Sequence, residues 1–120
     1  MSQPLPRAFR HAFRGLWAAL CGQRNLRIHL AVTLIVAIAG WILSLSPLEW
    51  AVIILAVGLV WAAELTNTAI EAIVDLVNPA YHPLAGAAKD AAAAAVLATA
   101  VAAALVGLII LLSQIIDRVM

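Results

Sequence analysis

The chain has 120 residues, of which 66% are hydrophobic and only 11% are charged, and its formal net charge at pH 7 is +1. This composition lies far outside that of soluble globular domains and excludes a separate soluble catalytic domain. Because a helix needs about 20 apolar residues to cross a bilayer, the length allows three spanning helices in a single domain over residues 1–120. We therefore expect an all-α integral membrane protein that does its chemistry at the bilayer.

An amphipathic helix is predicted over residues 5–23, before the first long apolar run. Apolar residues recur on one face of this helix, namely Phe9, Ala12, Phe13, Leu16, Trp17 and Leu20. The opposite face carries Arg7, Arg10, His11 and Arg14. Such a helix lies at the membrane surface, with its arginines near lipid phosphates. Basic residues are concentrated ahead of the first apolar run, and this asymmetry predicts a cytoplasmic N-terminus.

The first spanning helix is predicted over residues 30–45, an uncharged run of 16 residues that is about 24 Å long as a helix. His29 stands at its start, where we expect an interfacial side chain in preference to a metal ligand. The helix closes before Pro47, because the residue ahead of a proline disfavours helical geometry. Trp41 and Trp50 flank the turn, and indole rings prefer the membrane–water boundary, so this turn is the outer one.

The second spanning helix is predicted over residues 48–77 and carries polar side chains on one face near its end. They are Glu64, Asn67, Glu71 and Asp75. Steps of three, seven and eleven residues from Glu64 return to nearly the same angle at about 3.6 residues per turn. The apolar run ahead of them, residues 50–63, reaches only about 21 Å of a hydrocarbon core of about 30 Å, which buries Glu64 below the lipid surface. Clustered acids in lipid need a cation, a metal or a polar cavity, so this stripe predicts a functional site.

The third spanning helix is predicted over residues 84–116, after a short loop that contains Tyr81 and His82. Lys89 and Asp90 lie near its start. Two crossings of the membrane bring this pair back to the cytoplasmic face that also holds the acidic stripe. The charged residues of the two helices are therefore expected to converge.

The chain contains no phosphate loop, kinase-type glycine-rich loop, GxSxG elbow or HExxH zinc helix. What remains is a set of carboxylates, one amide and one lysine that face the compartment holding ATP. Carboxylate oxygens suit Mg²⁺, which usually takes one or two of them and completes its shell with phosphate and water. Lys89 can balance phosphate charge. A carboxylate at the depth of Glu64 suits a general base that takes a proton from a hydroxyl presented from within the bilayer.

Three runs of this sequence resemble the prokaryotic diacylglycerol kinase and undecaprenol kinase family: QRNLRIHL at 23–30, AELTNTAIEAIVDLV at 63–77 and YHPLAGAAKDAAAAAV at 81–96. The resemblance extends over nearly the whole chain. It implies a multi-pass protein of the bacterial cell membrane, assembled as a homotrimer with active sites shared between subunits. It also implies transfer of the γ-phosphate of MgATP to a lipid alcohol, either undecaprenol or diacylglycerol. The run at 23–30, together with SPLEW at 46–50, looks closer to the undecaprenol kinase branch.

Residue roles follow from the resemblance by matching position. Glu64 looks like the catalytic base and Glu71 like a metal ligand. Asn67 and Asp75 look like support for the polar site. The residues that look like the nucleotide-binding set are Tyr81, His82, Lys89 and Asp90.

Two positions depart from the family pattern. Gln23 stands where the family usually has a second metal-binding glutamate, and its amide oxygen can still bind a metal although one charge is lost. Pro4 stands where one branch has an arginine that touches ATP, and Arg7 is the nearest replacement. Two other functions stay open, an inactive scaffold of the same fold and a small oligomeric ion or proton pathway. Clustering of the acids at one end of one helix argues against the pathway.

Overall fold

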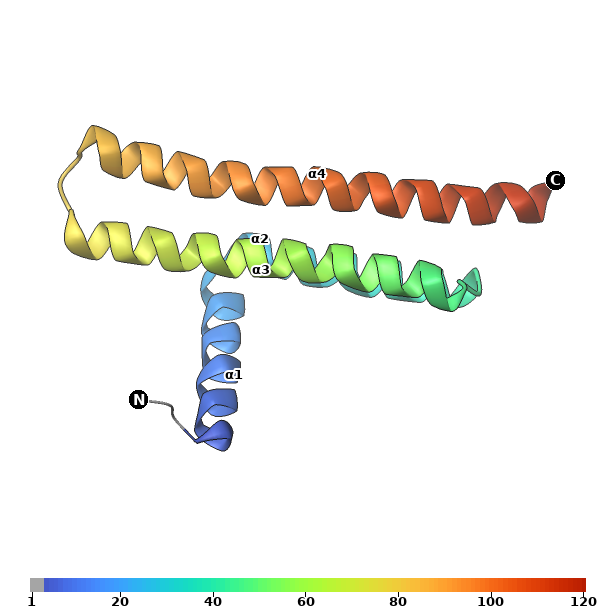
Figure 1. The fold of residues 1–120 in the computed structure, drawn as a ribbon, viewed down its shortest axis with the longest axis horizontal. Coiled ribbons are helices and arrows are strands. Elements are labelled where there is room, and N and C mark those ends of the chain that lie inside the picture. Colours follow the sequence, from blue (N-terminus) through green and yellow to red (C-terminus); the bar gives the residue numbers. More distant parts are fainter. Residues whose placement is uncertain (1–3) are drawn as a thin grey trace.

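The computed structural model describes residues 4–120, which form four helices and, within that range, no strand (Figure 1). The helices are α1 (Leu5–Gly22), α2 (Arg24–Ile42), α3 (Pro47–Val77) and α4 (Pro83–Val119). Three of them, α2, α3 and α4, are long and apolar enough to cross a membrane. The predicted all-helical architecture with three long apolar helices is therefore confirmed.

The turn between α2 and α3 ends α2 at Ile42, three residues before the predicted end of that span. Ser44 has a φ of 54°, a left-handed conformation that stops a helix. Its N–H donates to the carbonyl of Trp41 at 3.2 Å, and the Leu45 N–H donates to the carbonyl of Gly40 at 3.2 Å. This pair of hydrogen bonds is a Schellman motif, which satisfies the last carbonyls of α2 without further helical residues.

Helix α3 begins with a capping box. The Glu49 N–H donates to Ser46 Oγ at 3.2 Å, and the Ser46 N–H donates back to Glu49 Oε1 at 3.0 Å. Pro47 supplies the first helical position, where its missing N–H costs nothing. The indole of Trp50 then packs on Gly40 of α2, so closely that a β-carbon at Gly40 would lie 2.7 Å from Trp50 Cη2.

Helices α3 and α4 form an antiparallel hairpin that extends along the longest axis of the molecule (Figure 1). At the α2–α3 turn end, Gln114 Nε2 of α4 donates to both carboxylate oxygens of Glu49 at 3.0 Å. Arg118 donates from Nη2 to the carbonyl of Leu43 at 2.6 Å. At the other end, His82 caps α4 by accepting at Nδ1 the N–H of Leu84 at 3.1 Å. This last contact caps α4 alone; near the loop, α3 and α4 are joined by the ion pair of Lys89 with Asp75, and along their length by apolar packing.

Helix α1 runs crosswise to the other three and joins α2 at Gln23 (Figure 1). Gln23 has extended backbone geometry, with φ of −118° and ψ of 115°, which allows the chain to change direction within one residue. Arg27 stabilises this corner, because its Nη1 donates to the carbonyls of Leu20 at 3.1 Å and Cys21 at 2.9 Å. A guanidinium at the C-terminal end of α1 also complements the helix dipole. Beyond this corner, α3 and α4 continue to the loop that joins them, residues 78–82. This loop and the adjoining ends of the two helices are called the α3–α4 loop end.

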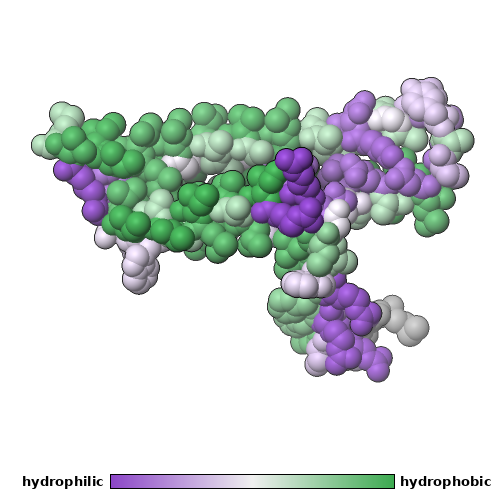
Figure 2. Space-filling view, turned by 180° about the vertical axis from the view of Figure 1, so that it is seen from behind, coloured by the Kyte–Doolittle hydropathy of each residue, from purple (hydrophilic) through white to green (hydrophobic). Residues whose placement is uncertain are grey.

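Very little of the chain is buried within a single subunit. The buried apolar residues are Ala19, Leu26, Leu45, Ile53, Val60 and Ala92. Large apolar side chains cover the outside of the three long helices, and hydrophilic residues gather at the α3–α4 loop end (Figure 2). A surface of this kind suits lipid or further protein around the hairpin, with water at the α3–α4 loop end.

Candidate active site at the α3–α4 loop end

Glu64 is the one charged residue among residues 4–120 that is buried, with 4% of its surface exposed. It lies where the apolar part of α3 gives way to the polar stripe that continues to Asp75. Thr68 Oγ1 donates to the Glu64 carbonyl at 3.0 Å, so the hydroxyl one turn later is satisfied inside the helix. Burying a carboxylate costs free energy unless a hydrogen-bond donor faces it, and the structure supplies such a donor.

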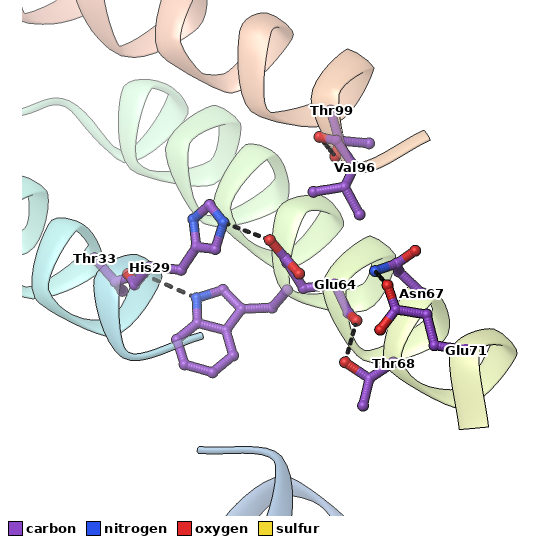
Figure 3. Close-up of polar contacts among 9 residues, drawn as sticks. His29, Thr33, Glu64, Asn67, Thr68, Glu71, Val96 and Thr99 are labelled. Carbon is purple, nitrogen blue, oxygen red and sulfur yellow. Dashed lines mark hydrogen bonds and ion pairs between the residues drawn. The ribbon is translucent and has the colours of Figure 1, made fainter. Parts of the chain in front are cut away.

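That donor is His29 on α2, whose Nε2 lies 2.9 Å from Glu64 Oε1 (Figure 3). The His29 carbonyl accepts the Thr33 hydroxyl at 2.7 Å, and Thr33 Oγ1 in turn accepts the Trp61 indole N–H at 3.0 Å. Trp61 precedes Glu64 by one helical turn, so both contacts join α2 to the same part of α3. Sequence analysis placed His29 at the membrane interface but did not find this partner. The sequence signal that could have indicated it is that His29 and Glu64 both lie near the cytoplasmic end of their predicted spans.

Asn67 and Glu71 form the next pair along α3, with Asn67 Nδ2 donating to Glu71 Oε1 at 3.3 Å (Figure 3). The other amide atom, Asn67 Oδ1, is buried and has no hydrogen-bond partner. Buried acceptors are rarely left unpaired in folded proteins. An unpaired amide oxygen beside a half-buried carboxylate is therefore ready to accept a donor or to bind a cation.

Asp75 and Lys89 form the pair nearest the loop, where the Lys89 ammonium donates to Asp75 Oδ1 across the α3–α4 hairpin. Their side chains are 65% and 38% exposed, respectively, so water screens this contact. The expected convergence of charged residues from the two helices is thus present as an ion pair. A lysine in a water-screened ion pair can exchange its carboxylate partner for a phosphate at a small cost in free energy.

The remaining candidate residues share no hydrogen bond with one another; three of them lie around this end, and Gln23 lies at the α1–α2 corner. Asp90 and Tyr81 are exposed, and Tyr81 has 90% of its surface in the open. His82 is committed through Nδ1 to capping α4. Gln23 is half-buried at the α1–α2 corner, and its side chain makes no capping hydrogen bond. These side chains are available to a ligand, but the chain alone does not assemble them into one pocket.

A protein-only metal cage is not formed, since no three His, Cys, Asp or Glu side chains within residues 4–120 come together as metal ligands. Mg²⁺ does not need such a cage, because it usually binds one or two carboxylates and takes its other ligands from phosphate and water. The oxygen donors of Glu71 and of the unpaired Asn67 Oδ1 fit that requirement. The site is thus compatible with a magnesium ion that arrives with a nucleotide.

Comparison with known proteins decides the family. A sequence model of the family described as prokaryotic diacylglycerol kinase matches residues 10–111, a range that includes every candidate site residue. The chain belongs to this family. The resemblance inferred from the sequence is therefore confirmed.

Curated relatives cover most of the chain. The undecaprenol kinase of Bacillus subtilis (strain 168) is 45% identical over 108 residues, which make up 90% of this chain and 88% of that protein. The diacylglycerol kinase of Escherichia coli (strain K12) is 38% identical over 109 residues, again 90% and 88% of the two chains. The diacylglycerol kinase of Synechocystis sp. is 46% identical over 101 residues, which make up 83% of this chain and 58% of that longer protein.

The predicted enzyme class, an ATP-dependent lipid kinase of the membrane, agrees with this family, and the ion or proton pathway is not favoured. The relatives are named for two different lipid acceptors at comparable identity. Family membership alone therefore does not choose the acceptor.

Proposed function

We propose that this protein transfers the γ-phosphate of MgATP to a lipid alcohol at the cytoplasmic face of the bacterial cell membrane. The observation that carries the proposal is the buried Glu64 carboxylate, held at the junction between an apolar groove and the polar α3–α4 loop end. A lipid kinase has to bring a hydroxyl from the bilayer to a nucleotide from water, and this junction is where the two environments meet.

The acceptor half is an apolar groove of about 530 Å³ between α2, α3 and α4. His29, Trp61 and Ala100 line it at the end near Glu64, and Ile53 and Ile115 line it toward the α2–α3 turn. A groove open along the side of the helices admits a lipid from the bilayer. A chain lying there would place a terminal hydroxyl beside the His29 and Glu64 pair.

The nucleotide half is the exposed α3–α4 loop end, where hydrophilic residues gather (Figure 2). Lys89 can turn from Asp75 to a phosphate. Asp90, Tyr81 and His82 lie around the start of α4, where they would contact the rest of the nucleotide. Glu71 and Asn67, with Gln23 as a neutral third donor, would hold Mg²⁺. When bound, the ion supplies electrostatic stabilisation of the charge that develops on the phosphate oxygens.

The chemical step requires in-line positioning more than covalent chemistry by the protein. The lipid hydroxyl oxygen attacks the γ-phosphorus, the bond from that phosphorus to the bridging oxygen of ADP breaks, and Glu64 takes the hydroxyl proton. Lys89 offsets the charge on the departing ADP. The products are a lipid phosphate and ADP, and Glu64 returns its proton to water before the next cycle.

We propose in addition that the protein works as a homotrimer with α1 lying on the membrane surface. The support is that most large apolar side chains of α2, α3 and α4 are uncovered in one subunit, and that the family resemblance implies three copies. Hydrophilic and hydrophobic residues occupy different sides of α1, with Phe9, Phe13 and Trp17 exposed (Figure 2). The crosswise direction of α1 suits an interfacial helix next to spanning ones.

Undecaprenol is the acceptor that we favour, because the runs at residues 23–30 and 46–50 resemble the undecaprenol kinase branch. The test offers undecaprenol and diacylglycerol in parallel to purified protein in lipid nanodiscs with labelled ATP. Phosphate should appear in the lipid fraction with Mg²⁺ and disappear with EDTA, and it should appear faster with undecaprenol. No labelled lipid with either acceptor would overturn the kinase proposal and leave an inactive scaffold.

A further inference from the structure

Within the described part of the chain, His29 makes the one side-chain hydrogen bond to the Glu64 carboxylate. The two side chains are 22% and 5% exposed, so the contact is largely shielded from water. Only Oε1 of Glu64 is engaged, at 2.9 Å from His29 Nε2. The second oxygen, Oε2, is left without a side-chain partner and is free to meet an incoming hydroxyl.

The direction of this hydrogen bond follows from the chemistry of the two groups. An ionised carboxylate can only accept hydrogen bonds, so His29 Nε2 carries the hydrogen whenever Glu64 is ready to act as a base. The neutral imidazole tautomer with hydrogen on Nε2 satisfies this condition, and so does the imidazolium ion. In either form the N–H that points at Oε1 holds the Glu64 carboxylate in one orientation.

A neighbouring set of hydrogen bonds joins α2 to α3 beside His29 without touching the imidazole ring. The His29 backbone carbonyl accepts the Thr33 hydroxyl at 2.7 Å, and the Trp61 indole N–H reaches Thr33 Oγ1 at 3.0 Å (Figure 3). The three residues tie the start of α2 to α3 within one turn of Glu64. The only hydrogen bond among these that reaches the Glu64 carboxylate is the one from His29 Nε2.

We propose that His29 is a positioning residue, which holds Glu64 through Nε2 in the orientation needed to accept the proton of the lipid hydroxyl. The proposal rests on the proposed function and extends it, because neither the family comparison nor the acidic stripe of α3 assigns a role to α2 in the proton transfer. His29 does not touch the reacting phosphate. It acts through Glu64, with Oε1 anchored and Oε2 left for the substrate.

A purely structural role would be that the same hydrogen bond only joins α2 to α3. The chain offers a matched control for it, since Thr33→Val removes the neighbouring α2–α3 hydrogen bond to Trp61 without touching Glu64. The two informative variants are His29→Leu, which removes the donor, and His29→Gln, whose amide nitrogen reaches a position similar to that of Nε2. All are compared with the parent in nanodiscs at saturating lipid.

Loss of a hydrogen bond to a charged group predicts that His29→Leu lowers kcat by about ten- to a hundredfold. The KM for ATP should stay within about twofold of the parent value, because nucleotide contacts are unchanged. His29→Gln should recover most of the lost kcat, and Thr33→Val should keep kcat while lowering the unfolding temperature. Parent-like kcat in His29→Leu, or equal loss in all three variants, would overturn the positioning role.

A second measurement does not depend on turnover. In protein labelled with ¹⁵N-histidine, the Nε2 resonance of His29 should shift when Glu64 is replaced in Glu64→Gln, while His11 and His82 should not move. An unchanged His29 resonance would refute the contact itself. If instead the parent protein lacks kinase activity but the resonance shifts, the proposed function is wrong. The role of His29 in catalysis is then refuted as well, although the His29–Glu64 hydrogen bond is confirmed. Kinase activity that is lost in Glu64→Gln and kept in His29→Leu would refute the positioning role alone.

Discussion

The contact between Gly40 and Trp50 gives a quantitative test of how α2 and α3 pack. A β-carbon at Gly40 would lie 2.7 Å from Trp50 Cη2 and 2.9 Å from Leu45 Cδ1, closer than such contacts normally come. Overpacking of this kind costs about 1–3 kcal/mol. Replacing glycine by alanine inside a helix gains about 1 kcal/mol from backbone propensity. Gly40→Ala should therefore lower the free energy of unfolding by about 0–2 kcal/mol.

The matched control is Gly15→Ala in α1, where no atom lies within 4 Å of the added β-carbon. This variant receives only the propensity gain, so it should be about 1 kcal/mol more stable than the parent. The difference between the two variants, about 1–3 kcal/mol, then isolates the clash with the indole. Both are measured by titrating detergent-solubilised protein with sodium dodecyl sulfate and following helicity by circular dichroism. Equal shifts for the two variants would show that Trp50 does not pack on Gly40.

Three further predictions concern the α2–α3 turn and the nucleotide end. Ser44→Gly should raise the free energy of unfolding by about 1 kcal/mol in the same titration, because glycine adopts a φ of 54° without strain; no gain would contradict the left-handed turn. Gln23→Glu should lower the Mg²⁺ concentration that supports half-maximal kinase activity, since it restores a charged ligand, and an unchanged requirement would remove Gln23 from the metal site. Lys89→Met should raise the KM for ATP by about tenfold or more, whereas Asp75→Asn, which releases the lysine from its ion pair, should leave it unchanged or lower it. A KM for ATP that is the same in Lys89→Met and the parent would exclude phosphate binding by Lys89.

The architecture could be predicted from sequence because its signals are local. Long apolar runs, the prolines at 47 and 83 and the asparagine–proline pair at 78–79 mark the helices and the turns between them. Helical periodicity placed Glu64 and Asn67 on one face, and the burial of Glu64 agrees with its position at the end of an apolar run. The end of α2 was misplaced because nothing in the sequence favours a left-handed serine at position 44.

The partners of the site residues could not be predicted in the same way. Periodicity relates residues on one helix, but it does not fix the rotation of one helix against another. The contact between His29 and Glu64, and the pairing of Lys89 with Asp75, both depend on that rotation. The corner at Gln23 and its stabilisation by Arg27 depend on a single extended residue between two helices, which composition does not reveal.

The central claim is that the buried carboxylate of Glu64 takes the proton of a lipid hydroxyl during phosphate transfer. The most direct measurement is the initial rate at which purified protein moves labelled γ-phosphate from MgATP into the lipid fraction. Glu64→Gln is compared there with Asp117→Asn, an exposed acid at the far end of α4. We expect Glu64→Gln to keep its fold but to lose about 10²- to 10⁴-fold in rate, while Asp117→Asn matches the parent. A folded Glu64→Gln variant that transfers phosphate at the parent rate would refute the role of Glu64 as the base.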